Sequence, residues 1–322
     1  MGFDFSLVTA PFRMQPGLRR LAPGTPQLTP SRPNGRHLRE KVAVLGSFAA
    51  QALLTVPGFD ERPVFRTVAA EAARDASPAF ALDASGDELA LRAPLLGWAI
   101  QGGAARGDGD PALGDLLRGL PPALRPAALL ALAYEEDFAV IDTTTTSIPW
   151  LAVCLPSRWA PETKVGRPFA EVHAPVADNT TLVAAAASLA RLVAGPERWE
   201  RFVWTITPEP RLHQHPERAG TDWPAAGAAP LDEAARSLAE VASFRWERQT
   251  FIPIVGTPHA LFTIHVQSLP LAEAIVTPED ARRVHAAVAS MSANVIAYRG
   301  LGVARERLLH WLARRGADAR PA

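Results

Sequence analysis

One histidine of this 322-residue chain stands where its imidazole could bind a metal ion. His173 lies in GRPFAEVHAPVADN, residues 166–179, between a short amphipathic run and the Ala174-Pro175 step, which ends any helix. A neutral imidazole is a common ligand for iron and other transition metals. A lone histidine beside an apolar run is more often a packing residue, so the local sequence favours packing and leaves ligation as the alternative.

Three cationic side chains lie within ten residues that overlap the start of this stretch. Arg158, Lys164 and Arg167 lie in SRWAPETKVGRP beside Trp159, and Lys164 is one of only two lysines in the chain. Cations next to an aromatic ring suit the carboxylates or phosphates of a planar cofactor. The alternative, which the local sequence favours, is a solvated loop with ion pairs to neighbouring glutamates such as Glu171.

A second group of charges lies on a predicted strand. The run RWERQTFIPI is rich in aromatic and β-branched residues, which is typical of a strand. Alternation places Arg245, Glu247 and Gln249 on one face, and Arg248 on the other with Trp246. A charged side chain that faces inward needs a partner, and an anionic ligand is one possibility.

The other histidines offer weaker patterns. His213 and His215 are two residues apart, so a strand would place both on one face, but a metal site needs a third ligand that the sequence does not suggest. A polar loop is therefore the favoured interpretation. His259 and His265 are six apart in a predicted strand and should also share a face.

Composition limits the partners and the compartment that we expect. The formal net charge is zero, so no overall field attracts nucleic acid or an anionic membrane. A single cysteine rules out an internal disulfide and any cysteine-based zinc or iron–sulfur site. The chain shows no secretory peptide and no membrane span. We therefore expect a cytoplasmic protein that binds neither nucleic acid nor membrane.

The elements that would position these residues change along the chain. Residues 1–36 are rich in Pro, Gly and Arg and predict an irregular N-terminal arm. A Gly- and Pro-rich region at 83–127 predicts a surface loop at 101–114. Hydrophobic periodicity and capping residues predict helices at 38–54, 63–76, 180–194, 277–291 and 304–316, and a helix that leads into a strand at 126–141.

Strand signals gather in the second half of the chain. Three runs are rich in aromatic and β-branched residues: 201–207, 244–255 and 259–269. Residues 150–159 predict a buried strand that leads into a turn. Strands in succession with helices before and after them predict an α+β fold with a mainly antiparallel sheet and flanking helices.

Four sequence blocks together resemble one protein family. They are PFRMQPGLRRL (11–21), PSRWAPETKVGRPFAEVHAPV (156–176), WERQTFIPIVGTPHALFTIHV (246–266) and AYRGL (297–301). In this order and spacing the chain resembles the heme-dependent oxidative N-demethylase family, in particular its heme-binding alpha subunit, formerly a domain of unknown function. The resemblance runs from about residue 11 to 314 and is weakest from 40 to 140.

The resemblance implies a fold and a cofactor. It implies a PAS-like antiparallel sheet with flanking helices around a pocket for heme b and its iron. Residues 1–322 would form a single heme-binding domain, with the irregular arm at 1–36 and the heme-pocket core at 150–270.

The resemblance also implies an activity. The chain would be a monooxygenase subunit that oxidises a small methylated amine with O2 and releases formaldehyde. Electrons from NADPH would arrive through reductase-type partner subunits that carry flavin and an iron–sulfur cluster. A chain with one cysteine and no dinucleotide-binding motif is consistent with a subunit that carries heme alone.

Residue roles follow the matching blocks. His173 matches the position of the axial ligand to the heme iron. Arg158, Lys164 and Arg167 match the preceding basic block, where they would contact the heme propionates or a partner. Arg248 is a second candidate for a propionate contact. The resemblance assigns no catalytic residue.

Three alternatives remain open at this point. His259 or His265 could be the ligand instead, or could lie in the distal pocket. The chain could be a non-catalytic PAS-like module that binds heme or senses a gas. It could also be a scaffold that has lost heme, in which the histidine is merely structural.

Overall fold

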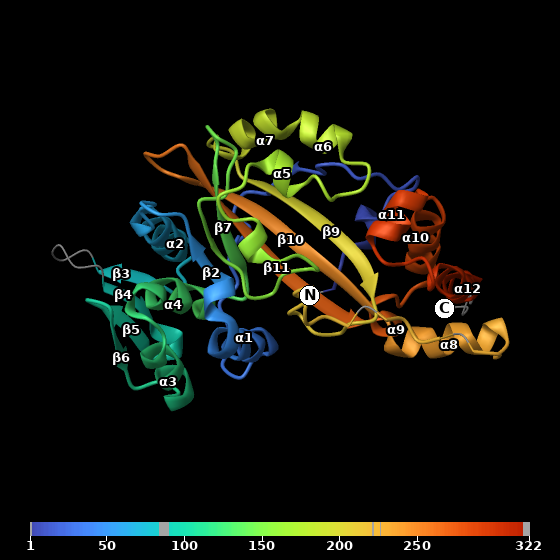
Figure 1. Cartoon of the computed structure of the whole chain (residues 1–322), viewed down its shortest axis with the longest axis horizontal. Helices are drawn as coiled ribbons and strands as arrows, with labels where there is room; N and C mark the ends of the chain where they lie inside the picture. The colour runs from blue at the N-terminus through green and yellow to red at the C-terminus, as the bar shows by residue number, and fades with distance from the viewer. Residues whose placement is uncertain (1, 84–89, 221, 226, 318–322) are drawn as a thin grey trace.

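A seven-stranded antiparallel sheet organises the molecule (Figure 1). The computed structural model describes residues 2–83, 90–220, 222–225 and 227–317. The strand order is β1-β9-β10-β11-β7-β8-β2. The strands are β1 (Arg19–Arg20), β2 (Leu53–Thr55), β7 (Asp137–Asp142), β8 (Trp150–Ala152), β9 (Trp199–Thr207), β10 (Ser243–Ile254) and β11 (His259–Pro270). This confirms the predicted α+β class and the strands predicted at 201–207, 244–255 and 259–269. Of the run at 150–159 only Trp150–Ala152 is a strand, and β1 and β2 were not predicted.

The register of the three long strands defines two faces of this sheet. Gln249 on β10 lies opposite Arg201 on β9, and Glu247 lies opposite Val203. Directly opposite residues share a face, so these four side chains lie together on what we call face A. The alternate residues of the same strands, including Arg248, make up face B.

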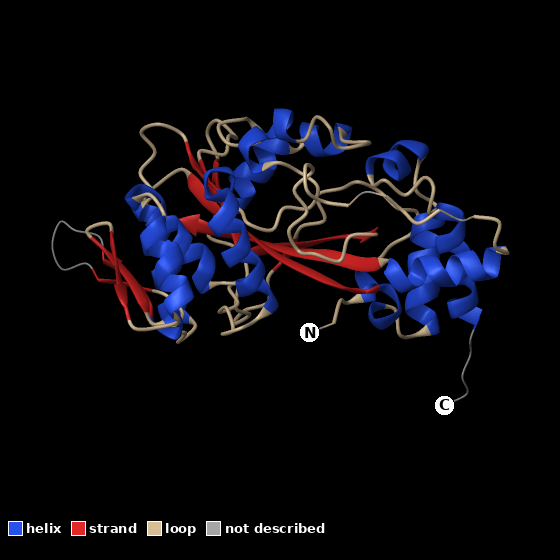
Figure 2. Ribbon diagram, turned by 60° about the horizontal axis from the view of Figure 1, so that its bottom comes forward, coloured by secondary structure: helices blue, strands red, loops and turns tan. Residues whose placement is uncertain are grey.

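Face B is covered by two groups of helices. Figures 1 and 2 show one group at each end of the long strands. One group is α1 (Arg36–Ala52), α2 (Arg62–Arg74) and α4 (Arg125–Ala133), and the other is α8 (Leu231–Val241), α9 (Leu271–Ala274), α10 (Pro278–Ala289) and α12 (Arg305–Ala317). Phe138 belongs to the apolar core of the first group and Phe244 to that of the second. Both phenylalanines are fully buried, so each end of face B has its own core.

Face A is covered by the connection between β8 and β9. This connection carries three short helices, α5 (Phe169–Val172), α6 (Thr180–Ala184) and α7 (Ala186–Val193), which Figure 1 shows beside β9 and β10. Val193 packs with Phe251 of face A, and Trp159 packs with Leu151. Irregular chain with short helices therefore faces the side of the sheet that carries Arg201 and Glu247.

The predicted helices are confirmed, apart from the Ala-rich run at 180–194. That run was expected to be one helix, but it is divided at Ala185 into α6 and α7. In α7 the buried residues are Ala190 and Val193, and Val193 packs against Phe251 of face A. Alanine side chains bury little apolar area, so the packing of Val193 has a large part in setting the direction of the chain.

A second sheet corrects the expectation for the Gly- and Pro-rich region. The surface loop predicted at 101–114 is instead a hairpin that leads into a helix. The four antiparallel strands are β3 (Ala81–Asp83), β4 (Ala90–Ala93), β5 (Trp98–Gln101) and β6 (Ala104–Gly107), followed by α3 (Pro111–Gly119). Gly102 and Gly103 turn the hairpin with positive φ angles of 55° and 74°. Trp98 and Ile100 are two residues apart on β5, so both side chains point to the same face and are buried in the core. These two apolar side chains are enough to anchor the short strand.

The N-terminal arm is held against the large sheet. Phe5 lies in the short 3-10 helix Phe5–Leu7 and its ring is 5.0 Å from that of Phe244. Further along, β1 pairs with β9. Within the described residues, no helix combines the length and the apolar content that crossing a membrane requires.

Candidate functional site

The helix α5 ends at Val172 and is followed by His173, whose two ring nitrogens differ in their contacts with the described residues. His173 Nδ1 lies 2.9 Å from the carbonyl oxygen of Phe169. A carbonyl only accepts, so Nδ1 carries the hydrogen and Nε2 carries the lone pair. The imidazole also stacks on the Phe169 ring, with centroids 3.8 Å apart. Metal-binding histidines use this arrangement, because a hydrogen bond at one nitrogen fixes the tautomer and directs the other.

The surroundings keep His173 neutral. Burial lowers the pKa of His173 to about 4. The hydrogen bond to Phe169 opposes this shift, while the positive charges of Arg201 and Lys164 add to it. Lys164 Nζ donates to the carbonyl oxygen of Val172 at 2.9 Å, and Asn179 Nδ2 donates to that of His173 at 2.8 Å. The backbone of this histidine is thus held on both sides, and its imidazole is unprotonated at neutral pH.

Arg201 is the cation of face A that the sequence reasoning missed. Its Nε is buried and has no hydrogen-bond partner in the part of the chain that the structure describes. Burial lowers the pKa of Arg201, and the charge of Glu247 opposes that shift. A buried guanidinium with an unused donor is suited to an anionic ligand. Strand alternation could have suggested it, because Arg201 shares a face with Gln249.

Glu247 supplies a carboxylate on the same face. It accepts hydrogen bonds from the Ser157 hydroxyl and, at 2.6 Å, from Gln249 Nε2. Only 9% of Glu247 is exposed. Face A therefore combines a buried carboxylate with a guanidinium whose Nε is buried, and the charge of this guanidinium acts on the neutral imidazole of His173.

Arg245 braces the loops around these groups. It is buried and donates to the carbonyl oxygens of Leu155 and Leu212 at 3.2 and 2.9 Å. Its Nε donates to Ser157 Oγ at 2.8 Å. Burial lowers the pKa of Arg245 to about 10, so it remains charged. It holds Ser157, and through Ser157 it orients Glu247.

Arg158 joins two of the sequence blocks that carry the family resemblance. Its Nη2 donates to Thr207 Oγ1 at 3.2 Å, and burial lowers its pKa. A Cβ at Gly300 would lie 3.2 Å from Arg158 Nη1. Next to Gly300, α11 (Ala293–Tyr298) ends at Tyr298, whose pKa is raised by burial, with a further contribution from the charge of Glu247. The blocks SRW and AYRGL therefore meet on the side of the sheet that carries Glu247.

Two predicted site residues lie away from this group. Arg167 is exposed and forms an i,i+4 ion pair with Glu171 at 3.1 Å. Arg248 lies on face B, where its Nε donates to Glu200 at 2.9 Å and its Nη1 to the carbonyl oxygen of Pro26. The structure brings His173, Lys164 and Arg201 into one electrostatic environment but does not bring Arg248 there.

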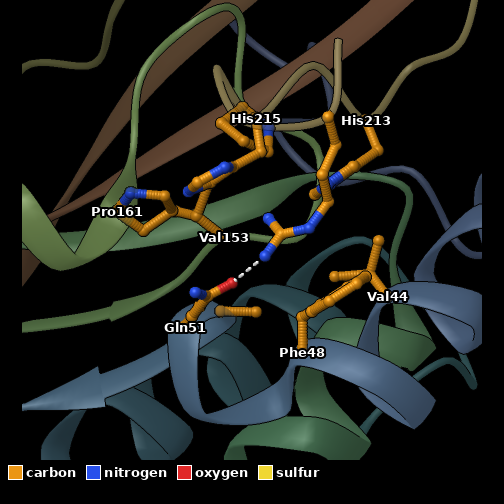
Figure 3. Close-up of a pocket in the computed structure, with 10 residues that line it drawn as sticks. Val44, Phe48, Gln51, Val153, Pro161, His213 and His215 are labelled. Atoms are coloured by element: carbon orange, nitrogen blue, oxygen red, sulfur yellow. Dashed lines mark hydrogen bonds between the residues drawn. The ribbon is translucent and has the colours of Figure 1, made fainter.

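His213 and His215 border a small hollow (Figure 3). His213 Nδ1 lies 2.7 Å from the carbonyl oxygen of Cys154, and His215 Nε2 lies 3.0 Å from Glu162. The free volume of the hollow is about 10 Å³, which is room for a single water molecule. These contacts agree with the interpretation of the two histidines as part of a polar loop.

His259 and His265 share face B, as their spacing predicts. His259 packs edge-on against the Phe59 ring, with centroids 5.5 Å apart. His265 is 3.0 Å from Glu135 and belongs to a separate polar cluster on the other side of the sheet from Arg201.

Residues 114–309 match a family model described as HODM_asu-like: haem-dependent oxidative N-demethylase, alpha subunit-like. The chain belongs to this family. The matched residues run from α3 into α12 and include His173, Arg201 and Glu247. The family resemblance is thereby confirmed, and three of its four sequence blocks lie within the matched residues, whereas the block at 11–21 lies before them. The family description identifies a heme-dependent N-demethylase, and its words "alpha subunit" imply that other subunits exist.

Proposed function

We propose that this HODM_asu-like chain binds heme on face A, with His173 Nε2 as the axial ligand, and acts as the heme-binding subunit of an oxidative N-demethylase. The observation that carries the proposal is the tautomer of His173. Its Nδ1–H is held by the Phe169 carbonyl oxygen, so a neutral Nε2 is left for iron.

The residues around His173 fit the charges of a heme. Heme propionates are carboxylates, and the buried Arg201 Nε lacks a partner among the described residues. Lys164 lies next to the histidine through its bond to Val172, and Arg158 is a further buried cation. We assign the propionate contacts to Arg201 and Lys164, with Arg158 as a further contact to a propionate or a partner. Arg167 and Arg248 already have carboxylate partners.

The chemistry belongs to the cofactor. Heme, when bound, supplies the activation of O2 that oxidises an N-methyl group, which leaves as formaldehyde. The electrons would come from NADPH through partner subunits that carry flavin and an iron–sulfur cluster. The single thiol of this chain, Cys154, is buried, which supports a subunit that carries no iron–sulfur cluster of its own.

Glu247 is our candidate for binding the substrate amine. A methylated amine is a cation at neutral pH, and a buried carboxylate can pair with it. Ser157 and Gln249 hold the two carboxylate oxygens in place, so Glu247 would orient the amine without moving itself. We further propose a PAS-like arrangement, heme b as the form of the cofactor, one functional unit over residues 1–322, and a cytoplasmic location.

Heme binding is tested by expressing the full chain with added heme precursor and recording the Soret band. We expect stoichiometric heme in the wild type and in the control His285→Ala, which changes a histidine of α10. In His173→Ala the Soret band should be lost or strongly shifted, while circular dichroism stays unchanged. Equal heme content and an unshifted band in His173→Ala would refute the ligand assignment.

Turnover is tested with a reductase supplied and a panel of methylated amines. We expect formaldehyde release that depends on the amine and on O2. Glu247→Gln should raise KM for the amine without changing the Soret band. Heme binding without turnover on any amine would instead support the alternative function, a non-catalytic heme-binding or gas-sensing module.

A further inference from the structure

Face B carries a cluster of two histidines and a carboxylate between its two apolar cores. His37 comes from the start of α1, Glu135 from just before β7, and His265 from β11. One ligand atom from each side chain lies within 4.8 Å of the other two. We propose that this cluster binds a divalent first-row transition-metal ion. The proposal is independent of the heme site, which lies on face A.

His37 has the tautomer that a metal ligand needs. Its Nε2 lies 2.7 Å from the carbonyl oxygen of Val266, so Nε2 carries the hydrogen. The lone pair is then on Nδ1, which lies 3.4 Å from Glu135 Oε2. A backbone carbonyl that holds the outer nitrogen is a common second contact of metal-binding histidines.

His265 can direct a lone pair to the same place. Its Nε2 lies 3.0 Å from Glu135 Oε2 and 2.8 Å from Gln267 Nε2. In one tautomer Nε2 donates to Glu135, and in the other it accepts from Gln267 and the hydrogen is on Nδ1, which lies 3.6 Å from Glu136 Oε1. A metal ion would select the second tautomer, in which two nitrogen lone pairs and one carboxylate oxygen converge.

The local charge also favours a cation. Glu136 is fully buried, and its Oε1 has no hydrogen-bond partner among the residues that the structure describes. The nearby ammonium of Lys41 forms an ion pair with Asp137, at 3.3 Å, and donates hydrogen bonds to three backbone carbonyl groups. Arg32 contributes a positive charge near Glu135, but no described residue donates a hydrogen bond to Glu136 Oε1. A cation at the cluster would therefore stabilise this buried carboxylate.

The ligand types indicate which ion would bind. Two imidazole nitrogens with one carboxylate oxygen suit Zn²⁺ or Fe²⁺ and leave coordination positions open for water or substrate. Mg²⁺ and Ca²⁺ prefer sites made of oxygen alone. The side chains of Glu135 and His265 are 11% and 15% exposed, so an ion can reach the site from solvent.

The site also ties two parts of the chain together. Glu135 and His265 lie within the residues that match the family model, whereas His37 lies before them. A bound ion would therefore link the start of α1 to the large sheet, and metal binding should raise the stability of the protein.

The test uses the full chain, with heme if it carries heme, after removal of loosely bound metal by a chelator. We expect one equivalent of Co²⁺ to bind with visible d–d absorption, and Zn²⁺ to displace it in a calorimetric titration. An anaerobic titration with Fe²⁺ distinguishes the two natural candidates. Glu135→Gln and His265→Gln should each weaken Co²⁺ binding by about 100-fold or more, and Glu136→Gln by about 10-fold.

Controls separate metal binding from folding and from heme. His285→Gln should bind Co²⁺ like the wild type. Circular dichroism and the Soret band should be unchanged in His265→Gln, because this residue lies away from face A. The proposal fails if the folded wild type binds neither Co²⁺, Zn²⁺ nor Fe²⁺, or if both ligand variants retain wild-type affinity. Neither outcome depends on whether heme binds to His173.

Discussion

The two faces of the large sheet are made by alternate residues of the same strands, yet they differ in chemistry. On β10, Phe244 and Trp246 point to face B, where they join an apolar core. Between them Arg245 points to face A, and Glu247 follows it there. Both faces are buried, so the difference is not one of exposure. Burial stabilises apolar side chains, but it makes charged ones depend on partners.

The elements that pack on the two faces explain this difference in chemistry. Face B is covered by helices of 11 to 17 residues such as α1, α8, α10 and α12, which present apolar stripes. Face A is covered by a connection whose helix α5 has four residues. Loops of this kind expose backbone carbonyl groups, and Arg245 satisfies several of them. Face B should therefore supply most of the stability, and face A the ligand chemistry.

The largest expected effect is on face B. Phe244→Ala removes a fully buried ring that contacts Phe5 and Trp204. We expect a loss of about 3–5 kcal/mol in the free energy of unfolding, because the cavity cannot fully collapse. Urea denaturation measures it. Val203→Ala on face A should cost less than half as much, and an equal loss would contradict the division between the faces.

A glutamate in the loop after β9 allows a test of whether an ionised side chain stabilises the edge of face A. Glu209 is buried, and although burial opposes its ionisation, hydrogen bonds from Arg211 and Gly220 lower its pKa to about 2. A carboxylate with a lowered pKa stabilises the fold above its unfolded pKa of about 4.5, and the stabilisation is lost as the pH falls toward 2. Half of the Arg211 side chain is exposed, so solvent screens the pair.

We therefore expect Glu209→Gln to cost about 2 kcal/mol at pH 7, with the difference from the wild type disappearing at low pH. Unfolding measured from pH 7 to pH 2 tests this expectation. The control is Glu279→Gln on α10, whose ion pairs are exposed and whose loss should be small. A Glu209→Gln effect that does not change with pH would point to lost packing rather than lost charge.

Two arginines on opposite faces give the sharpest test of the heme site. Arg201→Gln should weaken heme binding by about tenfold, because it removes a charge-assisted hydrogen bond. Arg248→Gln should leave heme affinity unchanged and lower stability through the loss of its bond to Glu200. Heme titration of the apo-protein gives both affinities. If Arg248→Gln weakened heme binding more than Arg201→Gln did, the site would have to be moved to face B.

The smallest effect is expected at Arg167. Its ion pair with Glu171 is exposed, and such i,i+4 pairs contribute about 0.5 kcal/mol or less. Arg167→Ala should leave both the denaturation midpoint and the heme content within error of the wild type. A clear loss of heme would assign this arginine to the propionates after all.

Much of the fold could be predicted because its signals are local. Alternation along β9, β10 and β11 reports which residues share a face, and Thr277 caps α10 as predicted, with its side chain accepting from the Asp280 backbone at 3.1 Å. The small sheet was missed because its strands have three or four residues and stand among glycines. Such short runs carry too little periodicity to be distinguished from a loop.

The candidate site likewise has some features that the sequence predicts and others that it does not. The fold class, the family and the choice of His173 as a candidate ligand follow from composition, periodicity and motif order, which are properties of the chain alone. Which charged side chains lie close together depends on the folded arrangement of distant segments. Strand pairing brings Arg201 opposite Gln249, which lies 48 residues later in the sequence. The rings of His37 and His265 lie close together although 228 residues separate them in the sequence. Burial, tautomer and the absence of a partner at Arg201 Nε among the described residues depend on such distant contacts, which no local pattern in the sequence records.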